Sequence, residues 1–305
     1  MEQPLGEHQT DTAWPTHAYQ LLDFGFGRKL ERFGELVLDR VSPAANDSQP
    51  HESQLWSTAS ARLTREGQIQ ALKPDLPETW SIRHESICLQ LRFTPFGHVG
   101  LFPEHAMHWS WLLSGKHSTA PNPSMAIEEP GKPKRALNLF AYTGSSTLVL
   151  ARAGWHVTHV DASTPAVAWA RTNAQSSQLN SAPVRWIVED ARTYAQREIR
   201  RGQLYDLILL DPPSYGHGPS GKAWQIERDL QPLLELCGRL LASDGRLLLT
   251  AHSESSFDTL QNLQPILENR SRTIEQLETG RMQLFDRAQR PLDCGWYTRA
   301  SCQLH

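Results

Sequence analysis

The 305-residue sequence lacks three features that would narrow its function at once. No apolar run approaches the roughly 18 residues that span a bilayer, and the first residues form neither a basic nor an apolar signal region. The formal net charge is −3, from 30 basic and 33 acidic residues, so the overall positive charge of many nucleic-acid-binding proteins is missing. We therefore expect a cytoplasmic protein with no membrane partner, and a local basic patch is not excluded.

Cysteine is scarce as well. The four cysteines contain no CxxC pair, so a structural zinc site is not expected and we expect no metal ion: they are Cys88, Cys237, Cys294 and Cys302. In a reducing cytoplasm they stay thiols. Hydrophobic residues make up 39% of the chain and charged residues 21%, which is typical of a folded soluble protein. The length suggests about two domains.

Composition divides the chain into four predicted parts. Residues 1–20 are polar and are expected to form a flexible N-terminus. Residues 21–102 mix apolar alternation with glycines, which predicts a small β-rich domain that binds substrate. Residues 103–134 begin with a proline-led helix and continue as a proline-rich linker. From residue 135 to 305 strands alternate with helices, and we interpret this part as the catalytic domain.

The alternation from residue 135 predicts an α/β fold with a mostly parallel sheet. The last two strands are expected at 273–280 and 294–302, joined by a long loop, and helices are expected at 224–243 and 255–270. Because βαβ connections are right-handed in nearly all cases, the carboxyl ends of the parallel strands share one edge. Ligands of open α/β sheets bind outside that edge, so the informative residues are those that directly follow strands.

A glycine turn follows the first of these strands, in Asn138-Leu139-Phe140-Ala141-Tyr142-Thr143-Gly144-Ser145-Ser146. Gly144 permits a tight turn and a close ligand approach, and the next helix offers unpaired N–H groups to an anion. The second and third glycines of GxGxxG are missing. The turn therefore suits a ligand with a carboxylate better than a pyrophosphate, although a purely structural glycine explains it too.

Acidic residues follow the second and third strands. Asp161, roughly 20 residues beyond the glycine turn, is placed to accept hydrogen bonds from a ribose diol. It is also placed to cap the next helix, a role open to Ser163 and Thr164. Asp190 can accept from an exocyclic amine such as that of adenine, or cap its own helix. Both alternatives stay open for each acid.

The fourth strand ends in the turn Asp211-Pro212-Pro213-Ser214-Tyr215. Two consecutive prolines fix φ and remove two backbone donors, so we expect the carbonyls of this turn to be free to accept from a donor in the pocket. Tyr215 offers a flat face beside them. A rigid loop start accounts for the prolines but not for their place after an apolar strand that ends in Asp211, which makes this turn the most specific signal in the sequence.

Taken in order, NLFAYTGSST, VDAS, ED and LDPPSY resemble the class I S-adenosylmethionine-dependent methyltransferases. More narrowly, they resemble the bacterial 23S rRNA methyltransferases that modify cytosine C5 or guanine. HVGLFPEHAMHW (98–109) is similar to the segment before the catalytic domain of that family, and RPLDCGWYTRA (290–300) to its closing strand. Residues 1–96 do not resemble the RNA-binding PUA module of the cytosine-specific members. The resemblance implies a Rossmann-like, mostly parallel seven-stranded sheet and S-adenosyl-L-methionine as cofactor, with S-adenosyl-L-homocysteine as product.

The resemblance also implies roles for single residues. The methionine part of the cofactor would lie against Phe140, Tyr142 and Gly144. Its nucleoside would contact four further residues: Asp161 at the ribose, Ala162 beside the adenine, Asp190 at the adenine amine and Ala191 at the ring edge. The catalytic residues would be Asp211, Pro212, Pro213 and Tyr215, with the acid and the prolines next to the transferred methyl and the target base stacked on the tyrosine.

One departure from the cytosine-specific members decides the expected chemistry. Methylation of cytosine C5 needs a thiolate that adds to the ring. After the fifth strand, where those members carry a cysteine, this chain has Ala251-His252-Ser253-Glu254, and Cys237 falls in the middle of a predicted helix. We therefore expect methylation of an RNA base nitrogen, such as a guanine amine in rRNA processing.

Other interpretations remain. The same cofactor pocket serves methyltransferases that act on a protein side chain or a small molecule, and an RNA-binding scaffold without activity also fits. A nicotinamide-dependent oxidoreductase is disfavoured by the missing glycines. His217 and Lys222 lie in a glycine-rich loop. His217 would handle a proton and Lys222 would bind a phosphate, or both belong to a solvated surface loop. His252 is either a substrate contact or a structural histidine. RNA is the expected partner, and monomer and homodimer both remain open.

Overall fold

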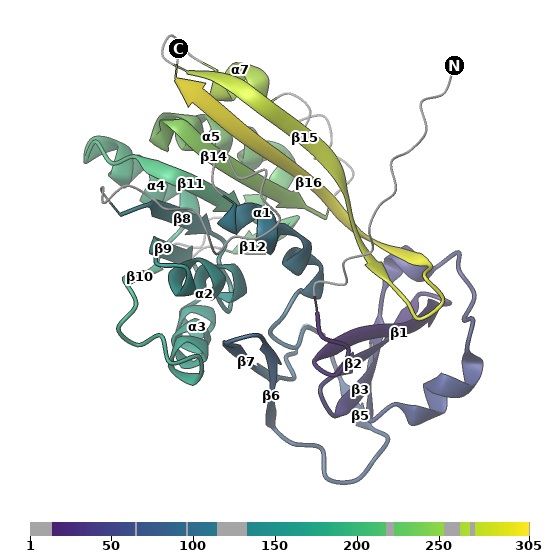
Figure 1. Ribbon diagram of the computed structural model, residues 1–305. Coiled ribbons are helices and arrows are strands. Elements are labelled where there is room, and N and C mark those ends of the chain that lie inside the picture. Colours follow the sequence, from purple (N-terminus) through teal and green to yellow (C-terminus); the bar gives the residue numbers. More distant parts are fainter. Residues whose placement is uncertain are drawn as a thin grey trace, which may run out of the picture.

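The computed structural model describes residues 14–64, 66–95, 97–114, 133–217, 223–252, 263–268 and 272–304. In this part of the chain a five-stranded N-terminal sheet lies beside a seven-stranded sheet (Figure 1). A long C-terminal hairpin extends from the larger sheet to the smaller one. The two regions are therefore joined by elements from both ends of the chain.

The larger sheet has the strand order β10-β9-β8-β11-β14-β16-β15. The first five are parallel: β10 (Val184–Val188), β9 (His156–Asp161), β8 (Arg135–Leu139), β11 (Tyr205–Leu210) and β14 (Leu241–Ala251). Strand β16 (Pro291–Leu304) is antiparallel to both β14 and β15 (Arg272–Phe285). The prediction of a Rossmann-like, mostly parallel seven-stranded sheet is confirmed.

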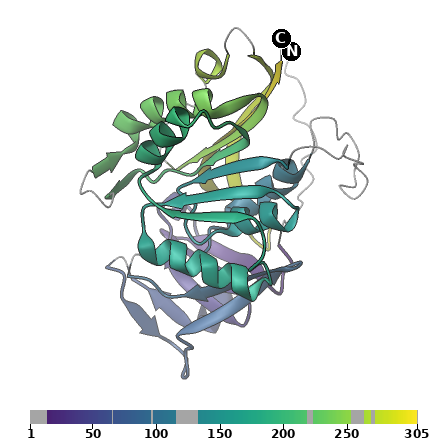
Figure 2. The same cartoon turned by 90° about the vertical axis from the view of Figure 1, so that its left-hand side faces the viewer.

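Side chains of the central strands alternate between two apolar cores, because successive residues of a strand point to opposite faces. In β11, Leu207 and Leu209 belong to one core, and Ile208 and Leu210 to the other. Both faces are therefore buried, as in other parallel sheets, and helices lie on both sides (Figure 2). The first core includes α2 (Ser145–Arg152), and the second includes α4 (Ala191–Arg200), α5 (Ile226–Leu240) and α7 (Gln264–Leu267).

The N-terminal region is built from short strands. Its sheet has the order β1-β2-β3-β4-β5, and a separate hairpin follows. The bounds are β1 Tyr19–Gly25, β2 Arg28–Phe33, β3 Leu36–Val41, β4 Ala61–Leu63, β5 Ile69–Ala71, β6 Thr79–His84 and β7 Ile87–Arg92. Two 3-10 helices, η1 (Pro43–Ala45) and η2 (Ser53–Thr58), connect β3 to β4. This content agrees with the β-rich composition, and the domain boundaries themselves stay predictions.

Helix α3 (Thr164–Ser176) closes the edge of β7 with side chains instead of a further strand. Trp169 donates to the Gln90 carbonyl (2.9 Å), and the Asn173 side chain accepts from the Gln90 N–H (2.8 Å). Directly after the helix, Ser177 bonds both the N–H (2.9 Å) and the carbonyl (3.1 Å) of Cys88. These three residues are four positions apart and share one face, so β7 is fixed against the larger region.

The C-terminal hairpin differs from the prediction. Strands were expected at 273–280 and 294–302 with a long loop between them, but β15 and β16 continue until only residues 286–290 separate them. The polar residues between 281 and 293 conceal an alternating pattern. Met282, Leu284 and Leu292 are buried in the core shared with the N-terminal sheet, while their neighbours point away. That core, and not a loop, determines the length of the hairpin.

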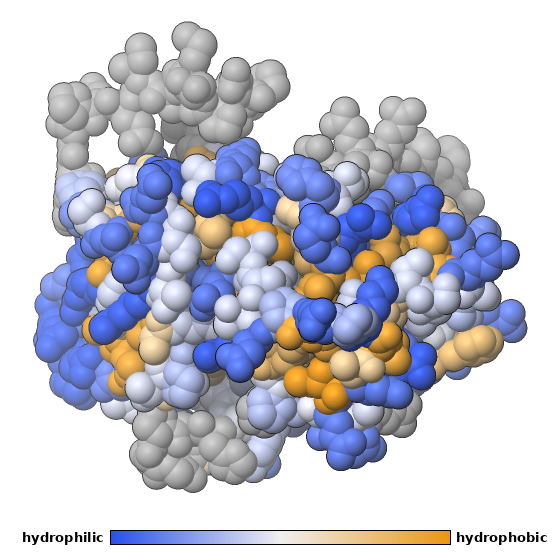
Figure 3. All heavy atoms as spheres, turned by 90° about the horizontal axis from the view of Figure 1, so that it is seen from below, coloured by the Kyte–Doolittle hydropathy of each residue, from blue (hydrophilic) through white to orange (hydrophobic). Residues whose placement is uncertain are grey.

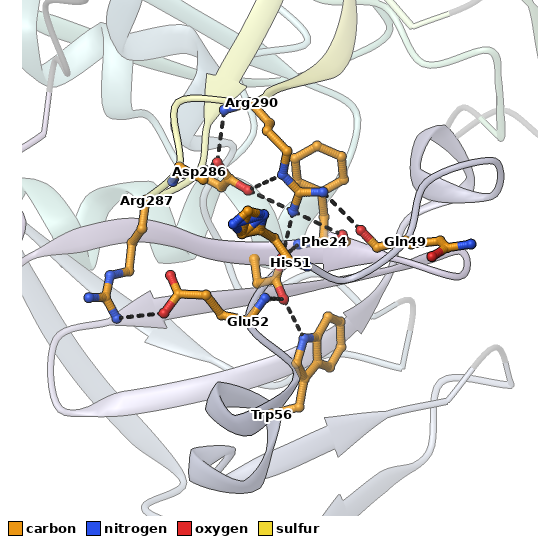
Figure 4. A network of polar contacts seen from close by, with 10 residues as sticks. Phe24, Gln49, His51, Glu52, Trp56, Asp286, Arg287 and Arg290 are labelled. Atoms are coloured by element: carbon orange, nitrogen blue, oxygen red, sulfur yellow. Dashed lines mark hydrogen bonds and ion pairs between the residues drawn. The ribbon is translucent and has the colours of Figure 1, made fainter.

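The tip of the hairpin is bound to the N-terminal sheet by Arg290 (Figure 4). Its guanidinium donates to Asp23 (2.6 Å) and to the Gln49 carbonyl (2.8 Å), and it lies over the Phe24 ring at 4.3 Å. Asp286, in the tip itself, accepts from the same guanidinium (2.8 Å). Residues from both ends of the chain thus share one ion-pair network.

Two helix predictions were wrong in their bounds. The helix expected from residue 224 begins at Ile226, because Trp224 lies in β13 (Ala223–Gln225), which pairs with β12 (Tyr215–His217). The helix led by Pro103 is a 3-10 turn, η3 (Pro103–His108), followed by the short α1 (Trp109–Leu113). Of the helix expected over 255–270, only α7 falls within the described residues. Residues 1–13 and most of the predicted linker, 115–132, lie outside them.

The surface seen from below is mostly hydrophilic, with apolar residues gathered in separate groups (Figure 3). Exposed apolar residues of this kind are usual in globular proteins. None of the helices in the described residues combines the length and the apolar character needed to cross a membrane.

Candidate functional site

A pocket opens at the carboxyl ends of β8 and β11. Four of the residues that the sequence singled out line it: Phe140, Tyr142, Gly144 and Asp211. Leu101, Phe102 and His105, from the segment before the larger sheet, line the opposite side. The structure therefore brings the glycine turn, the acid of the fourth strand and a preceding segment to one place.

The turn after β8 has an unusual backbone. Phe140 and Tyr142 have positive φ values of 55° and 48°, a conformation that costs free energy for residues with a Cβ. Gly144 has φ 87°, and a Cβ there would lie 3.1 Å from Ala170 Cβ. The Thr143 hydroxyl donates to the Gly100 carbonyl (2.7 Å), which fixes the turn to the preceding segment. A tight loop is thus held open at the start of α2, where helix N–H groups are available to a ligand.

Asp161 is the last residue of β9 and supports the glycine turn. Its carboxylate accepts from the Tyr142 N–H (2.8 Å) and from the Ser163 N–H (2.8 Å). Burial raises the pKa of Asp161, and these two hydrogen bonds only partly offset that. The N-cap of α3 is Ser163, which accepts from the Ala166 N–H, so capping does not require Asp161. A carboxylate has about four acceptor positions, so about two remain for ribose hydroxyls. The ribose role of Asp161 stays a prediction.

Asp190 follows β10 and caps α4. Its side chain accepts from the Thr193 N–H (2.9 Å) and the Thr193 hydroxyl (3.0 Å). The structure therefore shows the capping alternative, and both bonds go to one oxygen, Oδ1, so the adenine contact stays a prediction for the other oxygen. Ala191 is buried in the first turn of α4 and Ala162 is half-buried. None of these three lines the pocket described above.

Asp211 directly follows β11 and is held on both carboxylate oxygens. His105 Nε2 lies 3.1 Å from Oδ2, and the Thr250 hydroxyl donates to Oδ1 at 2.6 Å. On its other side His252 Nε2 is 3.9 Å from Oδ1. Burial opposes the charge of both partners, but their mutual attraction prevails. It raises the pKa of His105 to about 9 and lowers the pKa of Asp211 well below its usual range.

The sequence had suggested that the carbonyls of the Pro212–Pro213 turn are free to accept, but not all of them are. Trp224 donates its indole N–H to the Pro213 carbonyl (2.7 Å), and its ring contacts Phe140 with 4.9 Å between centroids. The expectation was wrong because Trp224 was assigned to a helix, whereas it lies in the β12–β13 hairpin that folds back over the turn. Tyr215, at the start of that hairpin, is 55% exposed, which leaves its stacking role a prediction.

Sequence reasoning missed the pocket residues from the segment before the larger sheet, which are Leu101, Phe102 and His105. His105 and Phe102 belong to the segment 98–109, whose resemblance was noted without giving any residue a role. The Phe102 ring lies 5.6 Å from the Tyr142 ring and 6.1 Å from the His252 ring. No local pattern singles these residues out, because their partners are far away in the sequence. Of the loop histidine and lysine, the side chain of His217 and the whole of Lys222 lie outside the described residues.

Comparisons with known proteins agree with this architecture. The family model described as Conserved hypothetical protein 95 matches residues 124–272. Ribosomal RNA large subunit methyltransferase K of Neisseria meningitidis is 32% identical over 44% of this chain and 38% of its own length. Ribosomal RNA large subunit methyltransferase K/L of Syntrophotalea carbinolica is 29% identical over 63% of this chain. The chain spans only 38% and 25% of these two curated relatives.

Two solved structures show the same fold. SMU.776, a methyltransferase crystallised with SAH, has a TM-score of 0.69 and 17% identity over 94% of this chain and 75% of its own. The SAM-dependent methyltransferase of Agrobacterium tumefaciens has a TM-score of 0.83 and 34% identity, covering 95% of this chain and 91% of that one. With identity at this level over nearly the full length of both proteins, the chain belongs to the S-adenosylmethionine-dependent methyltransferases.

Proposed function

We propose that this protein transfers a methyl group from S-adenosyl-L-methionine to a base nitrogen of RNA. The observation that carries the proposal is the position of Asp211. Asp211 lies between the end of β11 and two prolines. It lines the same pocket as the strained turn at Gly144. A nucleophile bound to the acid and a cofactor held by the turn would thus lie next to each other.

The residues of the pocket fit the cofactor. A Cβ at Gly144 would press on Ala170 of α3, and φ there is 87°, so the tight turn requires glycine. The turn lines the pocket, and the first N–H groups of α2 suit a carboxylate. Phe140 and Tyr142 would border the methionine part, and Asp161 retains acceptor positions for ribose hydroxyls. When bound, the cofactor supplies an electrophilic methyl group on a sulfonium. The chain's own residues bind and orient both reactants.

A target amine would donate a hydrogen bond to Asp211, which directs its lone pair away from the acid and toward the methyl. Positive charge that develops on the nitrogen is then stabilised by the nearby carboxylate. The prolines and the Trp224 contact to the Pro213 carbonyl keep this turn rigid. Catalysis therefore consists mainly of positioning two reactants, which can supply a large part of the rate enhancement.

The thiols favour nitrogen over cytosine C5 as the acceptor, because C5 methylation needs a thiolate. Cys294 is half-buried in β16, and burial together with the nearby Glu104 carboxylate raises its pKa well above the usual value. Cys237 is buried in α5, where desolvation raises its pKa to about 12. Both therefore stay protonated at neutral pH and are poor nucleophiles.

An RNA substrate is supported by the relatives, which are named for ribosomal RNA large subunit methylation. It would place the activity in the cytoplasm. The N-terminal sheet offers a second surface for such a substrate, because it shares one core with the 98–109 segment, which lines the pocket. Monomeric and homodimeric forms are both compatible with this proposal.

The test supplies labelled cofactor to the purified protein with separate pools of ribosomal RNA, protein and small metabolites. We expect label in RNA, and after digestion a nucleoside methylated on nitrogen, such as an N-methylguanosine. C5-methylcytosine as the product would contradict the chemistry proposed, and label confined to protein or metabolites would contradict the substrate. Asp211→Ala should reduce turnover much more than cofactor affinity, and an unchanged rate would remove Asp211 from the site.

A further inference from the structure

We propose that His105 is a positioning residue, which holds Asp211 as an oriented, ionised acceptor for the target amine. The inference rests on the proposed function and adds to it a residue from outside the larger sheet. His105 does not take part in the displacement at the methyl group. Its role is to fix the protonation state and the direction of the carboxylate that binds the amine.

The position of the imidazole is fixed by the elements around it. His105 lies in η3, its side chain is 12% exposed, and Nε2 faces Asp211 Oδ2 at 3.1 Å. The backbone of η3 is held at both ends: Trp14 donates to the Pro103 carbonyl (3.0 Å), and Arg299 donates to the Met107 carbonyl (2.9 Å). A side chain on so constrained a turn has little freedom, which is what accurate positioning of a second group requires.

Three titratable groups outside this pair face it. On the side of His105 they are the adjacent Glu104 and His108, whose ring lies 6.4 Å away. On the side of Asp211 the group is His252, together with the neutral Thr250 hydroxyl. Both carboxylates favour a protonated His105, while Arg299 and burial keep His108 neutral at ordinary pH by lowering its pKa. The charge of the pair is therefore set mainly by His105 and Asp211, and Glu104 and His252 act in the same direction.

The consequence for the reaction follows from hydrogen-bond chemistry. An ionised carboxylate only accepts, whereas a protonated carboxyl also donates and competes for the amine lone pair. A carboxyl that loses water when substrate covers the pocket tends to bind a proton. The imidazolium opposes this tendency, and Thr250 holds the other oxygen. Each oxygen still has a free acceptor position, so an amine N–H can bind without breaking either contact.

The experiment compares wild type with His105→Asn and with the control His156→Asn, which changes an exposed histidine at the start of β9. Single-turnover methylation is measured from pH 5 to 8, and binding of S-adenosyl-L-homocysteine is measured in parallel to check the fold. The wild type and the control should have nearly constant rates. In His105→Asn the rate should fall toward low pH, roughly tenfold for each pH unit below the new pKa of Asp211, and should recover toward pH 8. Cofactor affinity should stay within about twofold, since a change of that size is under 0.5 kcal/mol.

An unchanged pH profile in His105→Asn would overturn the proposal. So would an equal loss at every pH with weakened cofactor binding, because that result indicates a structural role. His105, Asp211 and His252 also place ligand atoms within 4.8 Å of one another, so zinc and a chelator are added in separate runs. Wild-type activity that requires zinc would assign the pair to a metal and contradict our interpretation.

A second measurement stands apart from catalysis and distinguishes failure of this inference from failure of the proposed function. Nitrogen NMR of the histidine rings should show His105 protonated through neutral pH in wild type and titrating at lower pH in Asp211→Asn. If RNA is not methylated but this difference appears, the ion pair stands and the substrate is wrong. If His105 titrates alike in both proteins, the inference fails even when RNA is the substrate.

Discussion

Two carboxylates join the N-terminal part of the chain to the larger sheet, and they do so in opposite ways. Asp23 is fully buried and accepts from three backbone N–H groups, the Trp56 indole and Arg290. Asp211 is 28% exposed at its side chain and has two close partners, one of them a histidine. The first has five donors for about four acceptor positions and pairs with a cation that never loses its proton. The second keeps positions open beside a titratable group. A carboxylate whose acceptor positions are all filled suits a structural contact between two regions. A carboxylate with open acceptor positions suits a site that binds substrate.

The largest effect that would test this comparison comes from Asp23→Ala. Its removal leaves several buried donors without an acceptor and takes away one of the two carboxylates that pair with the Arg290 guanidinium, and the free energy of unfolding should fall by about 3–5 kcal/mol. Urea denaturation followed by circular dichroism measures the loss. A change below about 1 kcal/mol would show that water or other groups replace the Asp23 carboxylate as the acceptor, and that the Asp23 contacts do not hold the two regions together.

Asp161→Ala should act on binding more than on stability. We expect the affinity for S-adenosyl-L-homocysteine to fall by roughly 1–3 kcal/mol, the scale of hydrogen bonds to a charged group. Calorimetry measures this, with Glu235→Ala as the control because Glu235 is an exposed acid of α5. The control should leave the affinity unchanged. Equal affinities in the two variants would place the ribose elsewhere.

The pair of His105 and Asp211 should also give stability a pH dependence between about pH 6.5 and 9. The Asp23 contact lacks it there, because the lowered pKa of Asp23 makes its contribution change only in acid. The pKa of His105 is raised to about 9, so its stabilising contribution is complete below its unfolded pKa near 6.5 and disappears as pH rises through about 9. The lowered pKa of Asp211 gives a contribution that is present above about pH 4 and is lost only in stronger acid. The difference in unfolding free energy between wild type and His105→Asn should therefore be constant from about pH 4 to 6.5 and shrink toward pH 9. A difference that does not change up to pH 9 would rule out an ionised His105 as its source.

The smallest effect is expected at the edge of the hairpin tip. Arg287 lies 3.6 Å from Glu52, with side chains 47% and 37% exposed. Arg287→Ala should change the unfolding free energy by only about 0–1 kcal/mol, because solvent screens such a pair. Comparison with Asp23→Ala in the same urea series shows whether burial, and not the presence of charge, distinguishes the two contacts. A loss as large as that of Asp23→Ala would refute this explanation.

What the sequence predicts well is local. The apolar strands, the glycine at 144 and the acids at strand ends follow from periodicity and from the geometry of βαβ units, and the sheet has the expected form. What it misses depends on contacts between distant residues. Asp23 and Arg290 are 267 positions apart, and His105 meets Asp211 only after the 98–109 segment has packed against the sheet. Trp224 was assigned to the wrong element because its apolar character suits a helix as well as a short strand over the Pro212–Pro213 turn.

The hairpin tip has a consequence for protein synthesis. Because Arg290 completes the coordination of Asp23, strands β1 to β5 cannot reach their final state until synthesis has proceeded as far as Arg290. Until then the early sheet carries a buried acid without its cation, and the apolar surface that later contacts Met282 and Leu284 stays uncovered. Contacts of such long sequence separation slow folding, so the N-terminal region is expected to need protection from aggregation while translation continues.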